Sequence, residues 1–132
     1  MINHVSFGVP HLERAAAFYD AVLLALGYVR VWTAPDAVGY GLQDGSDEFA
    51  VKVRADGGAA TRAGFHVAFT APSRASVEQF HATALRHGAV DNGGPALRTD
   101  YGPYYYAAFV IDPDGHPIEA VFNDRVSPLL QD

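Results

Sequence analysis

The chain has 132 residues, of which 49% are hydrophobic, enough to bury one sizeable core, so we expect a single domain spanning residues 1–132. Its formal net charge of -6 and the absence of a Lys/Arg cluster argue against nucleic acid or an anionic membrane as a partner. Cysteine is absent, which excludes disulfides, thiolate metal ligands and cysteine nucleophiles. With no signal-like start and no run of 18 apolar residues, a cytoplasmic protein is expected.

The first half of the chain predicts a strand, a helix and three more strands. Alternating apolar residues predict strands over 2–9, 28–33, 38–43 and 49–54, and apolar residues three or four apart predict a helix over 12–26. Gly27 is well placed to end that helix, and residues 56–60 have the composition of a linker.

The second half predicts the same order again. Strands are expected over 65–70, 89–92, 104–111 and 116–122, a helix over 73–87, a Gly/Pro-rich loop over 93–103 and a tight turn over 112–115. Ser73 is a suitable N-cap for the helix. The tail from Asn123 is expected to pack poorly.

An internal repeat connects the two halves. His4-Val5-Ser6-Phe7 returns 62 positions later as His66-Val67-Ala68-Phe69. The same offset also pairs identical residues at 10 and 72, 18 and 80, and 23 and 85. This register predicts an α+β fold built of two βαβββ modules, about 2–55 and 62–122, related by a pseudo-twofold axis.

Strand alternation then indicates which side chains share a surface. If Val5 and Phe7 face the helices, His4 points to the opposite face, and His66 does the same in the second module. In the last strand, Glu119 lies opposite the apolar side and points with the histidines. Two imidazoles and one carboxylate form a triad that suits a divalent metal with open positions for a substrate.

Further residues are candidates for the same surface. Aligning Val51-Lys52-Val53 with Ile118-Glu119-Ala120 predicts that Lys52 also faces this cup, and Glu48 has the same parity at the start of its strand. Alternation directs either Tyr105 or the pair Tyr104 and Tyr106 into the cup, where a phenol can hydrogen-bond a substrate oxygen.

The preceding loop supplies two candidate substrate-binding residues, Arg98 and Tyr101, with Arg98 suited to an acidic group. Two other histidines, His11 and His116, are expected to be solvated, and Asp112-Pro113-Asp114-Gly115 is interpreted as a structural turn.

Taken together, the early strand His, the Phe18-Tyr19 pair, the second strand His and the ending from Asp112 to Glu119 resemble the vicinal oxygen chelate superfamily. This superfamily includes glyoxalase I, extradiol dioxygenases, fosfomycin-resistance proteins, methylmalonyl-CoA epimerase and bleomycin-resistance proteins. The resemblance implies a half-open barrel of paired βαβββ units with a metal on the concave side, held by His4, His66 and Glu119. Glyoxalase I has a second glutamate at the position aligned with Lys52, so lactoylglutathione lyase activity is not expected.

The sequence therefore predicts an enzyme that uses one divalent metal ion, Zn, Ni, Mn or Fe, on a small substrate with vicinal oxygens. The reaction is a lyase, isomerase or ring-cleavage dioxygenase reaction, with Tyr105 and Lys52 as the candidate catalytic residues. The alternative is a metal-free, bleomycin-resistance-like protein that binds a small molecule. A homodimer is expected because half-open sheets leave edges and apolar surfaces to cover.

Overall fold

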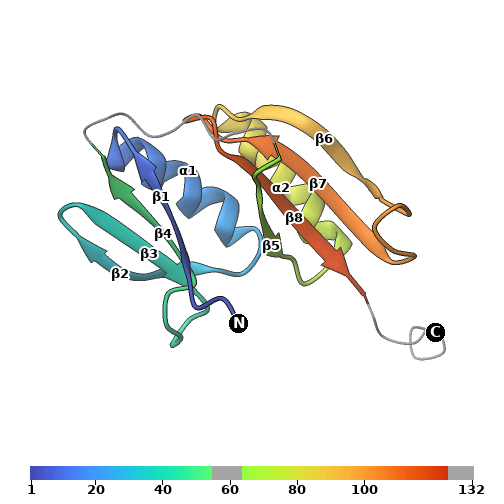
Figure 1. Ribbon diagram of the computed structural model, residues 1–132, viewed down its shortest axis with the longest axis horizontal. Coiled ribbons are helices and arrows are strands. Elements are labelled where there is room, and N and C mark those ends of the chain that lie inside the picture. The colour runs from blue at the N-terminus through green and yellow to red at the C-terminus, as the bar shows by residue number, and fades with distance from the viewer. Residues whose placement is uncertain (55–63, 125–132) are drawn as a thin grey trace.

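The computed structural model describes residues 1–54 and 64–124, which form an α+β fold of two four-stranded sheets and two helices (Figure 1). The first module contains β1 (Val5–Val9), α1 (Leu12–Leu24), β2 (Val29–Ala34), β3 (Ala37–Gly41) and β4 (Phe49–Val53). The second contains β5 (Val67–Thr70), α2 (Arg74–Arg86), β6 (Val90–Leu97), β7 (Tyr105–Ile111) and β8 (Pro117–Asn123). The predicted linker over 56–60 and most of the tail lie outside the described residues.

The strand orders of the two sheets confirm the predicted repeat. The first sheet has the order β1-β4-β3-β2 and the second β5-β8-β7-β6. In each sheet the first strand of the module runs parallel to the last, and the other pairs are antiparallel. The sheets are two separate units that turn their edge strands β1 and β5 toward each other (Figure 1).

One apolar core serves both modules. It includes Phe7 and Val9 of β1, which alternate inward as predicted, and Phe80 of α2. The rings of Phe49 and Phe69, one from each sheet, meet edge to face with their centroids 5.1 Å apart. Because each sheet buries one face against this core, the opposite face is left for a site.

The ends of the helices follow the predicted signals. Ser73 caps α2, where its Oγ accepts a hydrogen bond from the Ser76 N–H at 3.1 Å and the Ser76 Oγ accepts one from the Ser73 N–H at 3.1 Å. Gly27 follows α1 with a φ of 90°, which glycine adopts without strain. These local signals fix where each helix meets its next strand.

A buried polar cluster joins the two modules. The Tyr19 hydroxyl of α1 donates to Asp112 Oδ2 at 2.5 Å, and His116 Nδ1 lies 2.9 Å from the same oxygen. The His116 ring stacks on Phe7 of β1, with centroids 4.2 Å apart and an angle of 5° between planes. The prediction that His116 is solvated is therefore wrong: it is 2% exposed, because the turn folds its ring back onto β1.

The expected loop over 93–103 is corrected in its first part, while residues 98–103 form a loop as expected. Strand β6 continues through Gly93, Gly94 and Pro95 to Leu97, with two register shifts against β7. Gly and Pro are compatible with a strand at an edge or a bulge, and β6 is both irregular and at the edge of its sheet. Arg98 consequently follows a strand directly and is held in place by it.

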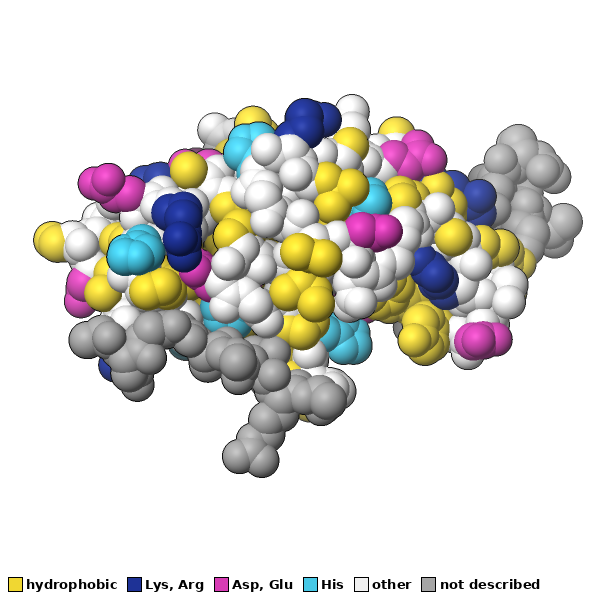
Figure 2. All heavy atoms as spheres, turned by 90° about the horizontal axis from the view of Figure 1, so that it is seen from above, with side chains coloured by type: hydrophobic (Ala, Val, Ile, Leu, Met, Phe, Trp, Pro, Cys, Tyr) yellow, Lys and Arg dark blue, Asp and Glu magenta, His cyan; other side chains and the backbone are white. Residues whose placement is uncertain are grey.

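The surface carries mixed charge on the face seen in Figure 2, where basic and acidic side chains are interspersed. No helix in the described part of the chain is both long enough and apolar enough to cross a membrane.

The module junction leads to a first prediction. Replacing Tyr19 by Phe removes only the hydroxyl that donates to Asp112, and the loss of a hydrogen bond to a charged, buried acceptor is expected to lower the free energy of unfolding by about 1–3 kcal/mol. Urea unfolding monitored by circular dichroism measures this change. The control is Tyr106→Phe, which removes an exposed hydrogen bond to Glu78 and is expected to change stability much less.

The loss of stability in Tyr19→Phe is expected to depend on pH. Burial alone raises the pKa of Asp112, but hydrogen bonds from His116 and Tyr19 lower it overall below the ordinary value of 3.8. A carboxyl group whose pKa is lowered by folding stabilises the native state above its unfolded pKa, and that contribution is lost as the pH falls through the folded pKa. The difference between wild type and Tyr19→Phe should be full at neutral pH and shrink below pH 3.8; a constant difference would contradict this account.

Candidate functional site

The carboxylate of Glu119 is buried, and it is bound by one side chain from just before β5 and one from the start of β7. It lies in β8 and is 1% exposed. His66 Nε2 lies 2.9 Å from its Oε1, and the Tyr105 hydroxyl donates to its Oε2. A buried carboxylate costs free energy unless its oxygens are satisfied, so these two partners account for a charged residue at this position.

Strand register places the three groups on one face of the second sheet. Glu119 is the partner of Ala68 in β5 and of Phe109 in β7. His66 precedes Ala68 by two residues and Tyr105 precedes Phe109 by four, so both side chains point to the face of Glu119. Alternation predicts the shared face of His66 and Glu119, and of the two alternatives for the tyrosines the structure has Tyr105 on that face.

The environment of Tyr105 determines what its phenol can do. Burial, followed by the hydrogen bond to Glu119 and the charge of that carboxylate, raises the pKa of Tyr105. The phenol is therefore protonated at neutral pH and acts as a hydrogen-bond donor that orients Glu119. Its neighbour Tyr106 faces the other way and donates to Glu78 on α2 at 2.8 Å.

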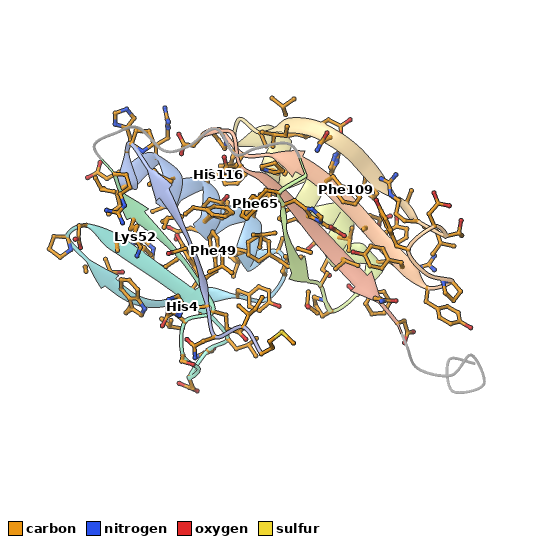
Figure 3. All side chains as sticks on the ribbon, viewed as in Figure 1. His4, Phe49, Lys52, Phe65, Phe109 and His116 are labelled. Carbon is orange, nitrogen blue, oxygen red and sulfur yellow. The ribbon has the colours of Figure 1, made fainter. Side chains whose placement is uncertain are left out.

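His4 is not brought to this pair within a single chain. It precedes β1, is exposed, and its Nδ1 lies 2.8 Å from Asn3 Oδ1 (Figure 3). In residues 1–54 and 64–124, no group of three His, Asp or Glu side chains is arranged to hold a metal ion. The His66 side chain, by contrast, is 49% exposed and accessible to a further group.

The predicted alignment of Lys52 with Glu119 is corrected by the strand registers. Val5 pairs with Phe49 in the first sheet and Val67 pairs with Ile118 in the second, so Ala50 occupies the position equivalent to Glu119. Lys52 lies two residues further along and pairs with Gly8. The sequence match was misleading because a shift of two residues preserves which face each side chain occupies.

The open face of the first sheet is lined mostly by small residues. Ser6 pairs with Ala50, and Gly39 is the partner of Ala50 on the other side. Trp32 covers Gly39 closely, since a Cβ at that glycine would lie 2.2 Å from the indole nitrogen. Lys52 is partly buried on this face, and the structure shows no hydrogen bond or ion pair from it to His66, Glu119 or Tyr105.

A cleft of about 380 Å³ lies between the two modules. It is lined by His66 and Ala68 from one side and by Val5, Glu48 and Phe49 from the other. At its far end the Tyr28 hydroxyl donates to the Thr70 carbonyl at 2.8 Å, and burial together with the charge of Glu48 raises the pKa of Tyr28. Glu48 thus lines the cleft, and the group it acts on there is Tyr28.

Arg98 and Tyr101 line a second hollow, next to Phe109 of β7. The Arg98 guanidinium lies over the Phe109 ring, with Cζ 5.2 Å from the centroid, and the Tyr101 ring meets Tyr105 at 5.3 Å. Phe109 was missed by the sequence reasoning, although its parity with Tyr105 in the same strand was available as a signal. Figure 3 shows it on the second sheet, apart from His4 and Lys52 on the first.

His66 and Glu119 supply donors of a kind that fits a divalent metal, since an imidazole with a carboxylate suits Zn, Ni, Mn or Fe. Without a metal, the 2.9 Å between Nε2 and Oε1 is the length of a hydrogen bond or ion pair. Tyr105 would then support the carboxylate from outside the set of ligands, as such partners commonly do.

Comparison with known proteins supports the fold and assigns the family. A family model described as the Glyoxalase/Bleomycin resistance protein/Dioxygenase superfamily matches residues 1–120. A search of curated proteins finds no significant match. A crystal structure of a glyoxalase/bleomycin resistance protein from Albidiferax ferrireducens T118 is 30% identical, with a TM-score of 0.75, and the match covers 90% of this chain and 95% of that one.

Two more distant structures show the same fold. A glyoxalase-related enzyme from Fulvimarina pelagi is 18% identical with a TM-score of 0.71, over 93% of this chain and 88% of that one. The fosfomycin resistance protein FosX from Mesorhizobium loti is 19% identical with a TM-score of 0.68, over 98% of this chain and 97% of that one. The family match over nearly all of the described residues shows that this chain belongs to the glyoxalase/bleomycin resistance protein/dioxygenase superfamily.

Proposed function

We propose that the protein is a divalent-metal-dependent enzyme that acts on a small molecule through two neighbouring oxygens. The ligands would be His66 and Glu119 together with His4. The observation that carries this proposal is the pairing of an imidazole with a buried carboxylate, on a face where His66 remains half exposed.

The residues of the site have distinct roles in this proposal. The metal, when bound, supplies a Lewis acid that polarises the substrate oxygens. Glu119 provides the negative charge that attracts the cation, and Tyr105 holds that carboxylate in one orientation. Phe109, whose ring centroid lies 6.3 Å from that of His66, forms an apolar wall that orients the substrate and excludes water.

We infer that His4 is supplied by a second copy of the chain. Within one chain His4 is exposed and does not form a metal-holding group with the pair, while β1 and β5 are edge strands flanking the cleft. Ile2 and Phe65, which adjoin these strands, are 76% and 46% exposed. Exposed apolar side chains beside unpaired edges favour association, and twofold association would bring each His4 to the other copy's cleft.

The first module constrains the reaction. Ala50 occupies the position equivalent to Glu119 and has no ligand or base atom, while Glu48 lies near Tyr28. Tyr105 is a donor and not a base, since its pKa is raised. Among the candidate reactions, this disfavours lyase or isomerase chemistry that depends on proton abstraction by a second glutamate, and favours oxidative ring cleavage of a molecule held by two oxygens.

The metal site predicts a ranking of variants. Glu119→Gln removes the charged ligand and should abolish measurable binding of Zn(II) or Ni(II), whereas Tyr105→Phe removes only its support and should weaken binding by about 10- to 100-fold. Isothermal titration of chelator-treated protein measures both, with the exposed Glu78→Gln as the control. Equal metal binding by all four proteins would remove Glu119 from the site, and no binding by wild type would favour a metal-free binding protein.

The shared site predicts complementation between two inactive variants. His4→Ala and Glu119→Gln are each expected to bind no metal, but refolding them together produces mixed dimers in which one of the two sites is intact. With random pairing, the mixture should recover about a quarter of the wild-type metal content. Mixing without recovery, in a protein that is dimeric by light scattering, would place all three ligands in one chain.

The register correction predicts where a further ligand can be introduced. Ala50→Glu places a carboxylate beside His4 as Glu119 lies beside His66, and should strengthen Ni(II) binding, whereas Lys52→Glu should not.

Wild type loaded with Ni(II) or Zn(II) is expected to show no turnover of the methylglyoxal–glutathione hemithioacetal, because position 50 holds alanine. Robust turnover would show that another residue of this chain serves as the base.

A further inference from the structure

A second hollow adjoins the proposed metal site on the same sheet. Its volume is about 460 Å³, and it lies where β6 ends and β7 begins, with Phe109 as its inner wall. The residues that line it are Asn92, Leu97, Arg98, Thr99, Asp100, Tyr101 and Phe109. Arg98 is the cationic residue in this lining.

Arg98 is held in place, but its guanidinium is only partly hydrogen-bonded. The backbone N–H of Arg98 donates to the Tyr105 carbonyl at 2.7 Å, and Nη2 of the guanidinium donates to the Gly94 carbonyl at 2.5 Å. Its Nε is buried and has no hydrogen-bond partner among the described residues. No carboxylate in residues 1–54 and 64–124 forms an ion pair with it, although the exposed Asp100 lines the same hollow.

The backbone makes room for this arrangement at one glycine. Gly93 has a φ of 140°, which side-chain-bearing residues rarely adopt. A Cβ at this position would lie 3.2 Å from Arg98 Nη2 and 3.2 Å from Phe109 Cδ2. The absence of a side chain at Gly93 therefore leaves room for the guanidinium over the Phe109 ring, a contact that arginine favours.

Phe109 connects Arg98 to the proposed metal ligands. Its ring centroid lies 5.2 Å from Arg98 Cζ and 6.3 Å from the centroid of the His66 ring. A planar molecule packed against Phe109 can thus have one end near His66 and Glu119 and its other end near Arg98. A guanidinium that is not paired with a carboxylate selects a negatively charged group at that end, and a carboxylate matches it in shape.

We propose that Arg98 binds a carboxylate on the substrate, and that the substrate class is aromatic acids carrying two neighbouring oxygens. This inference rests on the proposed function for the oxygen-binding end, whereas the carboxylate end depends on Arg98 and Phe109 alone. Asp100 opposes binding of an anion by charge repulsion, but it is exposed while Arg98 is directed inward over the ring.

The first experiment tests the carboxylate end on metal-free protein. Benzoate and its neutral analogue benzamide are titrated into wild type, Arg98→Gln, Arg98→Lys and the control Arg86→Gln, an exposed arginine on α2. Benzoate should bind wild type and Arg86→Gln about 10- to 100-fold more tightly than Arg98→Gln, with Arg98→Lys between them. Benzamide should not distinguish the four proteins, and circular dichroism verifies that each is folded.

The second experiment adds the oxygen-binding end. Zn(II)-loaded protein is titrated with catechol and with 3,4-dihydroxybenzoate, which differ only in the carboxylate. Wild type should prefer the acid, and Arg98→Gln should lose that preference while still binding catechol. Glu119→Gln should lose catechol binding and still bind benzoate in the first experiment.

The outcomes separate the two proposals. Benzoate binding that is absent in wild type, unchanged in Arg98→Gln or matched by benzamide would overturn the carboxylate site. Benzoate binding that depends on Arg98, in a protein that holds no metal and does not bind catechol, would support the carboxylate site and overturn the proposed function.

Discussion

The fold of this protein depends on one buried carboxylate. Asp112 accepts hydrogen bonds from Tyr19 of the first module and from the backbone N–H groups of Asp114 and His116 in its own turn. The turn leads directly into β8, the strand that carries Glu119. A carboxylate removed from water is stabilised by such donors, and this cluster holds the turn before β8 against α1 and β1. The position of the candidate site is thus a consequence of how the modules are joined.

Glu119 is held by the same kinds of partner as Asp112. Both carboxylates are almost fully buried, and each has a tyrosine hydroxyl and a histidine nitrogen as partners. At Asp112 the histidine is also buried and stacked on Phe7, so the cluster is closed and structural. At Glu119 the histidine is half exposed, so a ligand can approach from the cleft. Exposure of the imidazole, and not the identity of the residues, distinguishes the candidate site from the structural cluster.

The sequence predicted the modules and the shared face of His66 and Glu119, because a period of two determines the face of each strand residue. For the tyrosines it left open either Tyr105 or the pair Tyr104 and Tyr106, and the hydrogen bond to Glu119 identifies Tyr105. It did not predict that Ala50 is the equivalent of Glu119. Residues two apart in a strand share a face, so alternation alone does not distinguish Ala50 from Lys52, and Lys52 was chosen because it is charged. Burial of His116 depends on a contact with Phe7, more than a hundred residues away, and no local pattern encodes it. The continuation of β6 through Gly93 and Pro95 was hidden because these residues usually favour loops.

The irregular outer strands have a consequence for behaviour at high concentration. Strands β2 and β6 form the outer edges of the two sheets, and the pairing of each contains a register shift. In β6, Pro95 also removes one backbone donor from the edge. Bulged edges are poor templates for another strand, which protects a β-rich protein against aggregation. The inner edges, β1 and β5, pair without shifts, so the regular edges of the two sheets lie on the side of the molecule that carries the cleft.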